Sequence, residues 1–296
     1  MVSRIDIISL TCQNLFSLKM IRRKKNIYLD TCSLINLFEQ NRNIAKQLSN
    51  KFNIFLSLLN KFEICVYKNP IKKEELLKFC EELNPKQFLP LDFPITILNN
   101  FFADFIEGKG KTIWTISNWG VPDFNDKNNV SLIYKYLTES KEKFIVNNKK
   151  TREFILKLNK KDLNHSFQNP QKYLNCLFTQ DQIMIDLIEN IFNIQLNKIS
   201  SKNKIILSKS EPLIYFLGPL FLGYHRLAIK ETNYSPKKNP NSIDIAHCFY
   251  LGATDIFVTD ENEILTMLND FIHFKYLERF LKTKKILNTT QLIKMI

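Results

Sequence analysis

Four acidic residues are the candidates for chemistry in this sequence, because their positions would allow them to share one divalent cation. They are Asp30, Glu75, Asp244 and Asp260. Carboxylates brought close together repel one another unless a cation neutralises them. Mg²⁺ binds through a few carboxylate oxygens and keeps several waters. A metal held in this way could bind a phosphodiester oxygen, lower the pKa of a bound water and stabilise the leaving oxygen.

Two short predicted strands explain why these acids should meet. Residues 26–29 (NIYL) and 256–258 (IFV) are rich in β-branched and aromatic residues, and Asp30 and Asp260 follow them directly. In open α/β sheets, ligands bind outside the carboxyl ends of the strands. We therefore expect Asp30 and Asp260 at one edge of a sheet.

The other two acids are expected on helices. Asp244 lies in the first turn of a helix predicted over residues 243–251, which is apolar almost all round and should be buried. On the helix predicted over residues 71–83, a spacing of 100° per residue places Glu75 at the edge of the buried side and Glu74 nearer solvent. Glu75 is therefore the better candidate for an inward carboxylate, and Glu74 is the fallback.

Each candidate also has a purely structural interpretation. Asp30 could cap the helix that follows it, and Glu75 could be an ordinary first-turn acid favoured by the helix dipole. His247, one turn after Asp244, could bond a phosphate or an acid, or be a core histidine whose hydrogen bonds are satisfied. Thr259 could orient a water or a metal-bound Asp, or simply end a strand.

The composition favours a polyanionic partner or an anionic surface. The chain has 296 residues, with 42 Lys and Arg against 29 Asp and Glu, and a net charge of +13. Compositional bias is the alternative explanation, because Lys, Asn, Ile and Phe are abundant. A basic cluster near Phe154 could hold a phosphate backbone or could be a solvated helix face. It comprises Lys149, Lys150, Arg152, Lys157, Lys160 and Lys161.

Several classes of protein lack their motifs here. The sequence has no G-x-G-x-x-G, P-loop or H-E-x-x-H motif, which argues against dinucleotide binding, P-loop hydrolysis and zincin chemistry. A haloacid-dehalogenase-like phosphatase would need a second Asp at position 32, which is Cys32.

The cysteines and the N-terminus predict a cytoplasmic protein without a membrane span. The six cysteines are widely spaced with no C-x-x-C pair, which indicates free thiols in a reducing compartment. Residues 1–21 lack the long apolar region and cleavage site of a signal peptide. No run of about 18 apolar residues occurs.

Strands alternate with helices at both ends of the chain, which predicts a parallel sheet with helices on its two faces. The strands are expected at residues 26–29, 62–67, 256–258 and 285–287. We therefore predict an α/β fold, a three-layer α/β/α sandwich with a central, mostly parallel sheet and a large helical insertion. The expected parts are an extension over 1–21, a core over 22–84 and 236–296, and the insertion over 85–235.

The motifs NIYLDTCSL and SIDIAHCFYLGATDIFVTDENEIL, with the helix bearing Glu75 between them, resemble the PIN-domain pattern. The second motif is the most specific, because it has D-x-x-H, a strand and Thr-Asp in order. The resemblance implies an α/β/α fold and a Mg²⁺- or Mn²⁺-dependent ribonuclease, often a toxin or defence component. Carried over residue by residue, the metal-site acids would be Asp30, Glu75, Asp244 and Asp260.

The chain departs from a compact PIN domain in the long span between Glu75 and Asp244. We interpret this span as a helical insertion that could shape an RNA groove or bind a partner. Glu261 or Glu263 could assist after Asp260. The resulting hypothesis is an endoribonuclease acting on RNA rather than DNA, controlled by an antitoxin or a defence complex, with oligomerisation left open. The alternative is a catalytically degenerate PIN-like module that binds RNA or a protein partner.

Overall fold

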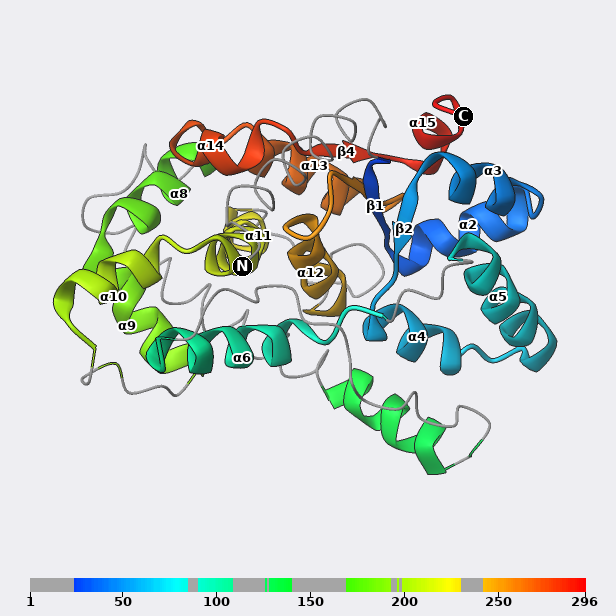
Figure 1. The fold of residues 1–296 in the computed structure, drawn as a ribbon, viewed down its shortest axis with the longest axis horizontal. Helices are drawn as coiled ribbons and strands as arrows, with labels where there is room; N and C mark the ends of the chain where they lie inside the picture. Colours follow the sequence, from blue (N-terminus) through cyan, green and yellow to red (C-terminus); the bar gives the residue numbers. More distant parts are fainter. Residues whose placement is uncertain are drawn as a thin grey trace, which may run out of the picture.

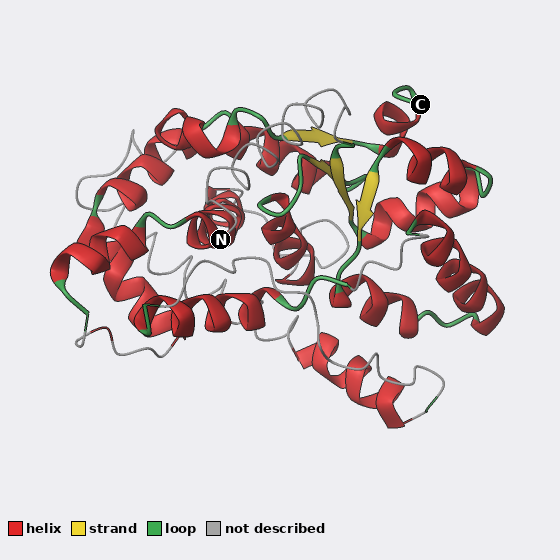
Figure 2. Cartoon of the chain, in the orientation of Figure 1, coloured by secondary structure: helices red, strands yellow, loops and turns green. Residues whose placement is uncertain are grey.

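The structure, a computed structural model, is an α/β fold around a four-stranded sheet in which every strand pair is parallel. It describes residues 24–84, 90–108, 126, 128–139, 169–192, 196, 199–229 and 242–296. The strand order is β2-β1-β3-β4, and helices lie on both faces (Figure 1, Figure 2). The predicted fold class is therefore confirmed. The strands are β1 (Asn26–Leu29), β2 (Asn53–Phe55), β3 (Ile256–Val258) and β4 (Lys285–Leu287).

Helices from both ends of the chain cover the first face of the sheet. Successive side chains of a strand point to opposite faces, so Ile27 and Leu29 of β1 share this face with Ile256 and Val258 of β3. They pack in one core with Leu34 and other apolar residues of the covering helices. These helices are α2 (Thr31–Gln40), α3 (Ile44–Lys51), α4 (Leu58–Cys65), α5 (Pro70–Leu83) and α15 (Thr289–Ile293).

The second face carries the other strand residues, Tyr28, Phe257 and Ile286, which belong to a larger core. Helices from the middle of the chain share this core with the sheet, and α11 packs against α6, α8, α12 and α13. The elements on this side are α6 (Pro94–Ile106), α8 (Pro170–Thr179), α9 (Asp181–Phe192), α10 (Ser201–Ser208), α11 (Glu211–Ile229), α12 (Ser242–Cys248), η3 (Phe249–Leu251), α13 (Asn262–Ile272), η4 (Lys275–Leu277) and α14 (Glu278–Leu281). Residues 128–139 form a further helix.

The predicted strands at 26–29, 256–258 and 285–287 are confirmed, but the strand predicted at 62–67 is wrong. Most of that segment belongs to α4, and the observed second strand is Asn53–Phe55. A capping box explains the difference. Ser57 Oγ accepts the N–H of Asn60 at 3.4 Å, and Asn60 Oδ1 accepts the N–H of Ser57 at 2.8 Å. The predicted extension over 1–21 and the basic cluster around Phe154 lie outside the described residues.

In the part of the chain that the structure describes, no single helix is long and apolar enough to cross a membrane. Taken together, α10 and Glu211–Gly223 of α11 have the length and composition of a membrane span, but a bend of 56° separates them. Leu213, Tyr215 and Leu217 of α11 are fully buried in the core of this protein.

Candidate functional site

Asp30 lies at the carboxyl end of β1 and is buried, with 5% of its surface exposed. Its N–H donates to the carbonyl oxygen of Val258 at 3.1 Å, which extends the pairing of β1 with β3. Its Oδ1 accepts the N–H of Ser33 at 2.8 Å, so Asp30 caps α2, as its structural interpretation expected. Burial raises the pKa of Asp30 to about 6, although hydrogen bonds from Thr259 and Ser33 and the charge of His247 oppose this rise.

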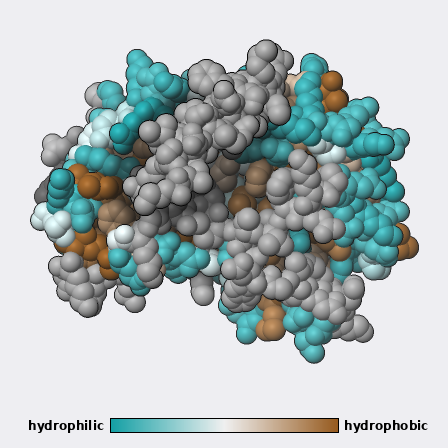
Figure 3. Space-filling view, viewed as in Figure 1, coloured by the Kyte–Doolittle hydropathy of each residue, from teal (hydrophilic) through white to brown (hydrophobic). Residues whose placement is uncertain are grey.

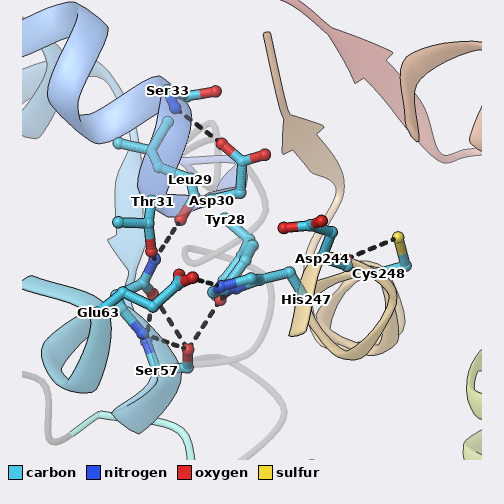
Figure 4. Close-up of polar contacts among 11 residues, drawn as sticks. Tyr28, Leu29, Asp30, Thr31, Ser33, Ser57, Glu63, Asp244, His247 and Cys248 are labelled. Carbon is cyan, nitrogen blue, oxygen red and sulfur yellow. Dashed lines mark hydrogen bonds and ion pairs between the residues drawn. The ribbon is translucent and has the colours of Figure 1, made fainter. Parts of the chain in front are cut away.

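Asp244 lies in the first turn of α12, across from the end of β1. Figure 4 shows the carboxylates of Asp30 and Asp244 both lying in the space between α2 and α12. The charges of both acids act on the same neighbours. Burial is the largest cause of the raised pKa of Cys248 and of Cys32, and the charges of Asp30 and Asp244 add to it in both cases. The structure therefore brings together these two predicted acids.

His247 connects α12 to β1 and α4 through two hydrogen bonds. Its Nδ1 lies 2.5 Å from Tyr28 Oη, and its Nε2 lies 2.9 Å from Glu63 Oε2 (Figure 4). Tyr28 Oη also lies 2.7 Å from Ser57 Oγ. His247 is buried and both ring nitrogens have partners, as expected for a core histidine, and one of these partners is an acid.

The charge on His247 is set by the acids around it. Burial lowers the pKa of His247, but the hydrogen bond and charge of Glu63, followed by the charges of Asp30 and Asp244, raise it above its ordinary value. The three carboxylates therefore favour the protonated form of the imidazole. Because His247 lies one turn from Asp244, its hydrogen bonds to Tyr28 and Glu63 also fix the position of Asp244 relative to β1.

Glu63 is a site residue that the sequence analysis missed, because residues 62–67 were predicted as a strand. On the observed helix α4, Glu63 follows Asn60 by one turn and shares its side of the helix. The Asn60 side chain donates to the carbonyl oxygen of Leu29 at 3.1 Å and to Thr31 Oγ1 at 3.2 Å. The capping box Ser57-x-x-Asn60 is the sequence signal that could have revealed the helix and hence Glu63.

The structure does not bring Glu75 to the other acids. Glu75 Oε2 lies 2.7 Å from Arg42 Nη2, and its side chain is 39% exposed. The fallback, Glu74, pairs instead with Lys78 at 2.9 Å. Arg42 follows the C-terminal end of α2, whereas Asp30 caps its N-terminal end. The ten residues of α2, at about 1.5 Å each, separate the two ends by about 15 Å.

Asp260 follows β3 as predicted, but both of its oxygens already have partners. Oδ2 accepts a hydrogen bond from Asn36 Nδ2 at 2.8 Å. Oδ1 accepts from the N–H of Thr289 at 2.9 Å and from Thr289 Oγ1 at 3.0 Å. Asp260 therefore ties the end of β3 to α2 and α15.

Of the acids after Asp260, Glu261 lies nearer the site than Glu263. The side chain of Glu263 pairs with Arg226 at 3.1 Å, which joins α13 to α11. The charge of Glu261 acts on Cys32, and its N–H donates to Thr259 Oγ1 at 3.1 Å. Thr259 is fully buried and hydrogen-bonds Asp30, so it orients the acid after β1.

Cys32, in the first turn of α2, is affected by the charges of several acidic side chains. Burial raises the pKa of its thiol to about 12, and the charges of four acids contribute to this rise. In order of effect the acids are Asp30, Glu261, Asp260 and Asp244. Among the described residues, no three His, Cys, Asp or Glu side chains form a metal-binding group as they stand. Asp30 and Asp244 are the two acids that could hold Mg²⁺, which needs only one or two carboxylates and fills its other positions with water or phosphate oxygens.

Comparisons with known proteins found no relative of this chain. No protein-family model matches it, and searches of curated proteins and of solved structures gave no match.

Proposed function

We propose that this chain is a Mg²⁺- or Mn²⁺-dependent endoribonuclease of PIN type, with the cation held by Asp30 and Asp244. The position of the buried Asp30 at the carboxyl end of β1, with Asp244 in the first turn of the neighbouring helix α12, carries the proposal. Two carboxylates brought to the same edge of the sheet favour a cation that would neutralise them. The net charge of +13 supports a polyanionic substrate.

The residues around the proposed cation would orient and balance the two acids. Ser33 N–H and Thr259 hold the carboxylate of Asp30, and the His247 hydrogen bonds hold the helix that carries Asp244. When bound, the metal would supply Lewis-acid activation of a water and of the scissile phosphate. Because burial raises the pKa of Asp30 to about 6, its carboxyl group must lose a proton to bind the cation in mildly acidic solution.

The biological setting belongs to the same proposal. The PIN resemblance supports RNA over DNA as the substrate, and an antitoxin or defence complex as the controlling partner. Cys32, Cys65, Cys80 and Cys248 are free thiols, which fits a reducing cytoplasm.

A second function, binding of RNA or a protein partner without catalysis, is favoured by the positions of two expected acids. Glu75 pairs with Arg42, and Asp260 is hydrogen-bonded by Asn36 and Thr289. With these acids engaged elsewhere, the site would be closer to a degenerate PIN-like module.

Cleavage of labelled single-stranded RNA by the purified full chain tests the proposal. We expect cleavage with Mg²⁺ or Mn²⁺ and none with EDTA. Asp30→Asn and Asp244→Asn should each weaken Mn²⁺ binding by at least about tenfold and reduce cleavage accordingly. Glu75→Gln is the matched control and should behave as the wild type.

Two outcomes would count against catalysis at this site. Equal cleavage by the wild type, Asp30→Asn and Asp244→Asn would identify a contaminating nuclease. RNA binding by the wild type without cleavage at any metal concentration would favour the second function.

A further inference from the structure

A cavity of about 260 Å³ opens in the helical part of the molecule, between α8, α10, α11, η4 and α14. Figure 1 shows α8, α10 and α14 at the end of the molecule opposite α2 and α5. The cavity is therefore separate from the acids at the sheet edge. Its inner wall is apolar (Phe178, Ile214 and Leu277), and Tyr276, Lys209 and Arg279 provide polar groups.

The apolar wall could bury a flat ring. Phe178, Ile214 and Leu277 are each at most 3% exposed, so they form a fixed surface. Tyr276, in contrast, is 43% exposed and has ring surface open to a ligand. Phe274 connects the two aromatic residues, with centroid distances of 6.2 Å to Phe178 and 6.1 Å to Tyr276. The volume suits one ring system, because pockets for larger ligands begin at about 300 Å³.

The cavity also carries positive charge suited to an anion. The Arg279 guanidinium lies 4.4 Å from the centroid of the Phe280 ring and forms no ion pair with the described residues. Lys209 Nζ forms one ion pair, with Asp181 Oδ1 at 3.1 Å. An arginine can bind a phosphate through two parallel hydrogen bonds. The same elements carry further exposed or half-exposed lysines, namely Lys202, Lys204 and Lys275.

The surface around the cavity is amphiphilic rather than uniformly polar. Figure 3 shows hydrophobic side chains among hydrophilic ones at the end of the molecule where α9 and α10 lie. Ile205 and Ile206 of α10 are 41% and 50% exposed. A ligand that has both an apolar ring and a negative charge matches this combination better than a bare anion does.

We infer that this cavity binds one nucleotide of a single-stranded RNA, with the base against Tyr276 and Phe178 and the phosphate at Arg279 and Lys209. Proteins that bind single strands combine aromatic platforms with cations that follow the backbone. The inference goes beyond the proposed cleavage site, because it assigns RNA binding to a different part of the chain. It requires no metal.

Binding of a fluorescent single-stranded RNA octamer to the full chain in EDTA tests this inference apart from cleavage. Tyr276→Ala and Arg279→Gln change exposed side chains, so both variants should fold, which circular dichroism would verify. The matched controls are Tyr134→Ala, which removes a tyrosine that is 62% exposed elsewhere, and Lys78→Gln, which removes an exposed cation on α5. Unlabelled mononucleotide, inorganic phosphate and a polyglutamate peptide serve as further probes.

We expect Tyr276→Ala to raise the Kd for the octamer about tenfold, because an aromatic stacking partner is lost. Arg279→Gln should also weaken binding, and should make the dependence of log K on log salt shallower by about 0.7, the value for one lost contact to a single-stranded phosphate. Both controls should retain the wild-type Kd and salt slope. Mononucleotide should compete with the octamer more weakly than unlabelled octamer does, but more strongly than phosphate.

Several results would overturn the inference. Wild-type Kd values and salt slopes in both cavity variants would show that the RNA does not enter the cavity. Competition by phosphate equal to that by mononucleotide would assign a simple anion site. Tight mononucleotide binding without octamer binding would assign a free nucleotide, and Tyr276-dependent binding of polyglutamate would assign an acidic peptide.

Discussion

Replacing Asp30 by Asn should make the folded protein more stable at neutral pH. Asn caps helices about as well as Asp, so it can keep the hydrogen bond from the Ser33 N–H at 2.8 Å. The substitution removes a charge that burial disfavours, since burial raises the pKa of Asp30 from 3.8 to about 6. At about 1.4 kcal/mol per pKa unit, the ionised carboxylate costs the folded state about 3 kcal/mol.

The expected gain depends on pH. Because the pKa of Asp30 is higher in the folded protein, the folded state binds more protons than the unfolded state between these two values. The wild-type free energy of unfolding should therefore fall as the pH rises from about 4 to about 6 and be independent of this group at higher pH. Asp30→Asn lacks this dependence. Its advantage should be near zero at about pH 4 and largest above about pH 6.5.

Urea denaturation of the wild type and Asp30→Asn across this pH range, in EDTA, would measure the difference. Asp30→Ala is the control, because it removes the charge and the cap together and should lose part of the gain, by about 1 kcal/mol. Added Mn²⁺ should stabilise the wild type alone, by an amount set by the ratio of its concentration to Kd. If Asp30→Asn is less stable than the wild type at neutral pH, the charge serves the helix dipole and our reasoning from burial is refuted.

Three further predictions concern other parts of the structure. Glu63→Gln should lower the pKa of His247, which NMR titration would measure, and should cost about 2 kcal/mol of stability below the unfolded pKa of 6.5. The cost should shrink as the pH rises through the folded pKa, because a raised histidine pKa stabilises the fold only below that value; an unchanged titration would contradict this. Gly218→Ala should lower the free energy of unfolding by about 2 kcal/mol, because a Cβ there would lie 2.3 Å from Cε2 of Phe271; a higher melting temperature would show that α11 adjusts. Glu75→Gln should cost less than about 1 kcal/mol and leave Mn²⁺-induced stabilisation intact, since its ion pair is exposed; loss of that stabilisation would place Glu75 in the site.

The sequence by itself determined the elements that local residue patterns specify. The strands at residues 26–29, 256–258 and 285–287 are short β-rich runs, and their positions were predicted correctly. Asp30 and Asp260 were placed at strand ends for the same reason, because the residue after a strand lies at the sheet edge whatever the packing. The helix over residues 71–83 was likewise readable from its apolar period.

Tertiary structure decided which acids meet. A helical period shows which side of α5 is buried but not what it faces, and Arg42 provides a closer partner for Glu75. Glu63 joins His247 because the capping box turns residues 58–65 into a helix and Asn60 bonds that helix to the end of β1. Contacts between residues far apart in the chain depend on the packed core rather than on local spacing, so the sequence predicted the sheet edge and the folded chain selected the carboxylates around it.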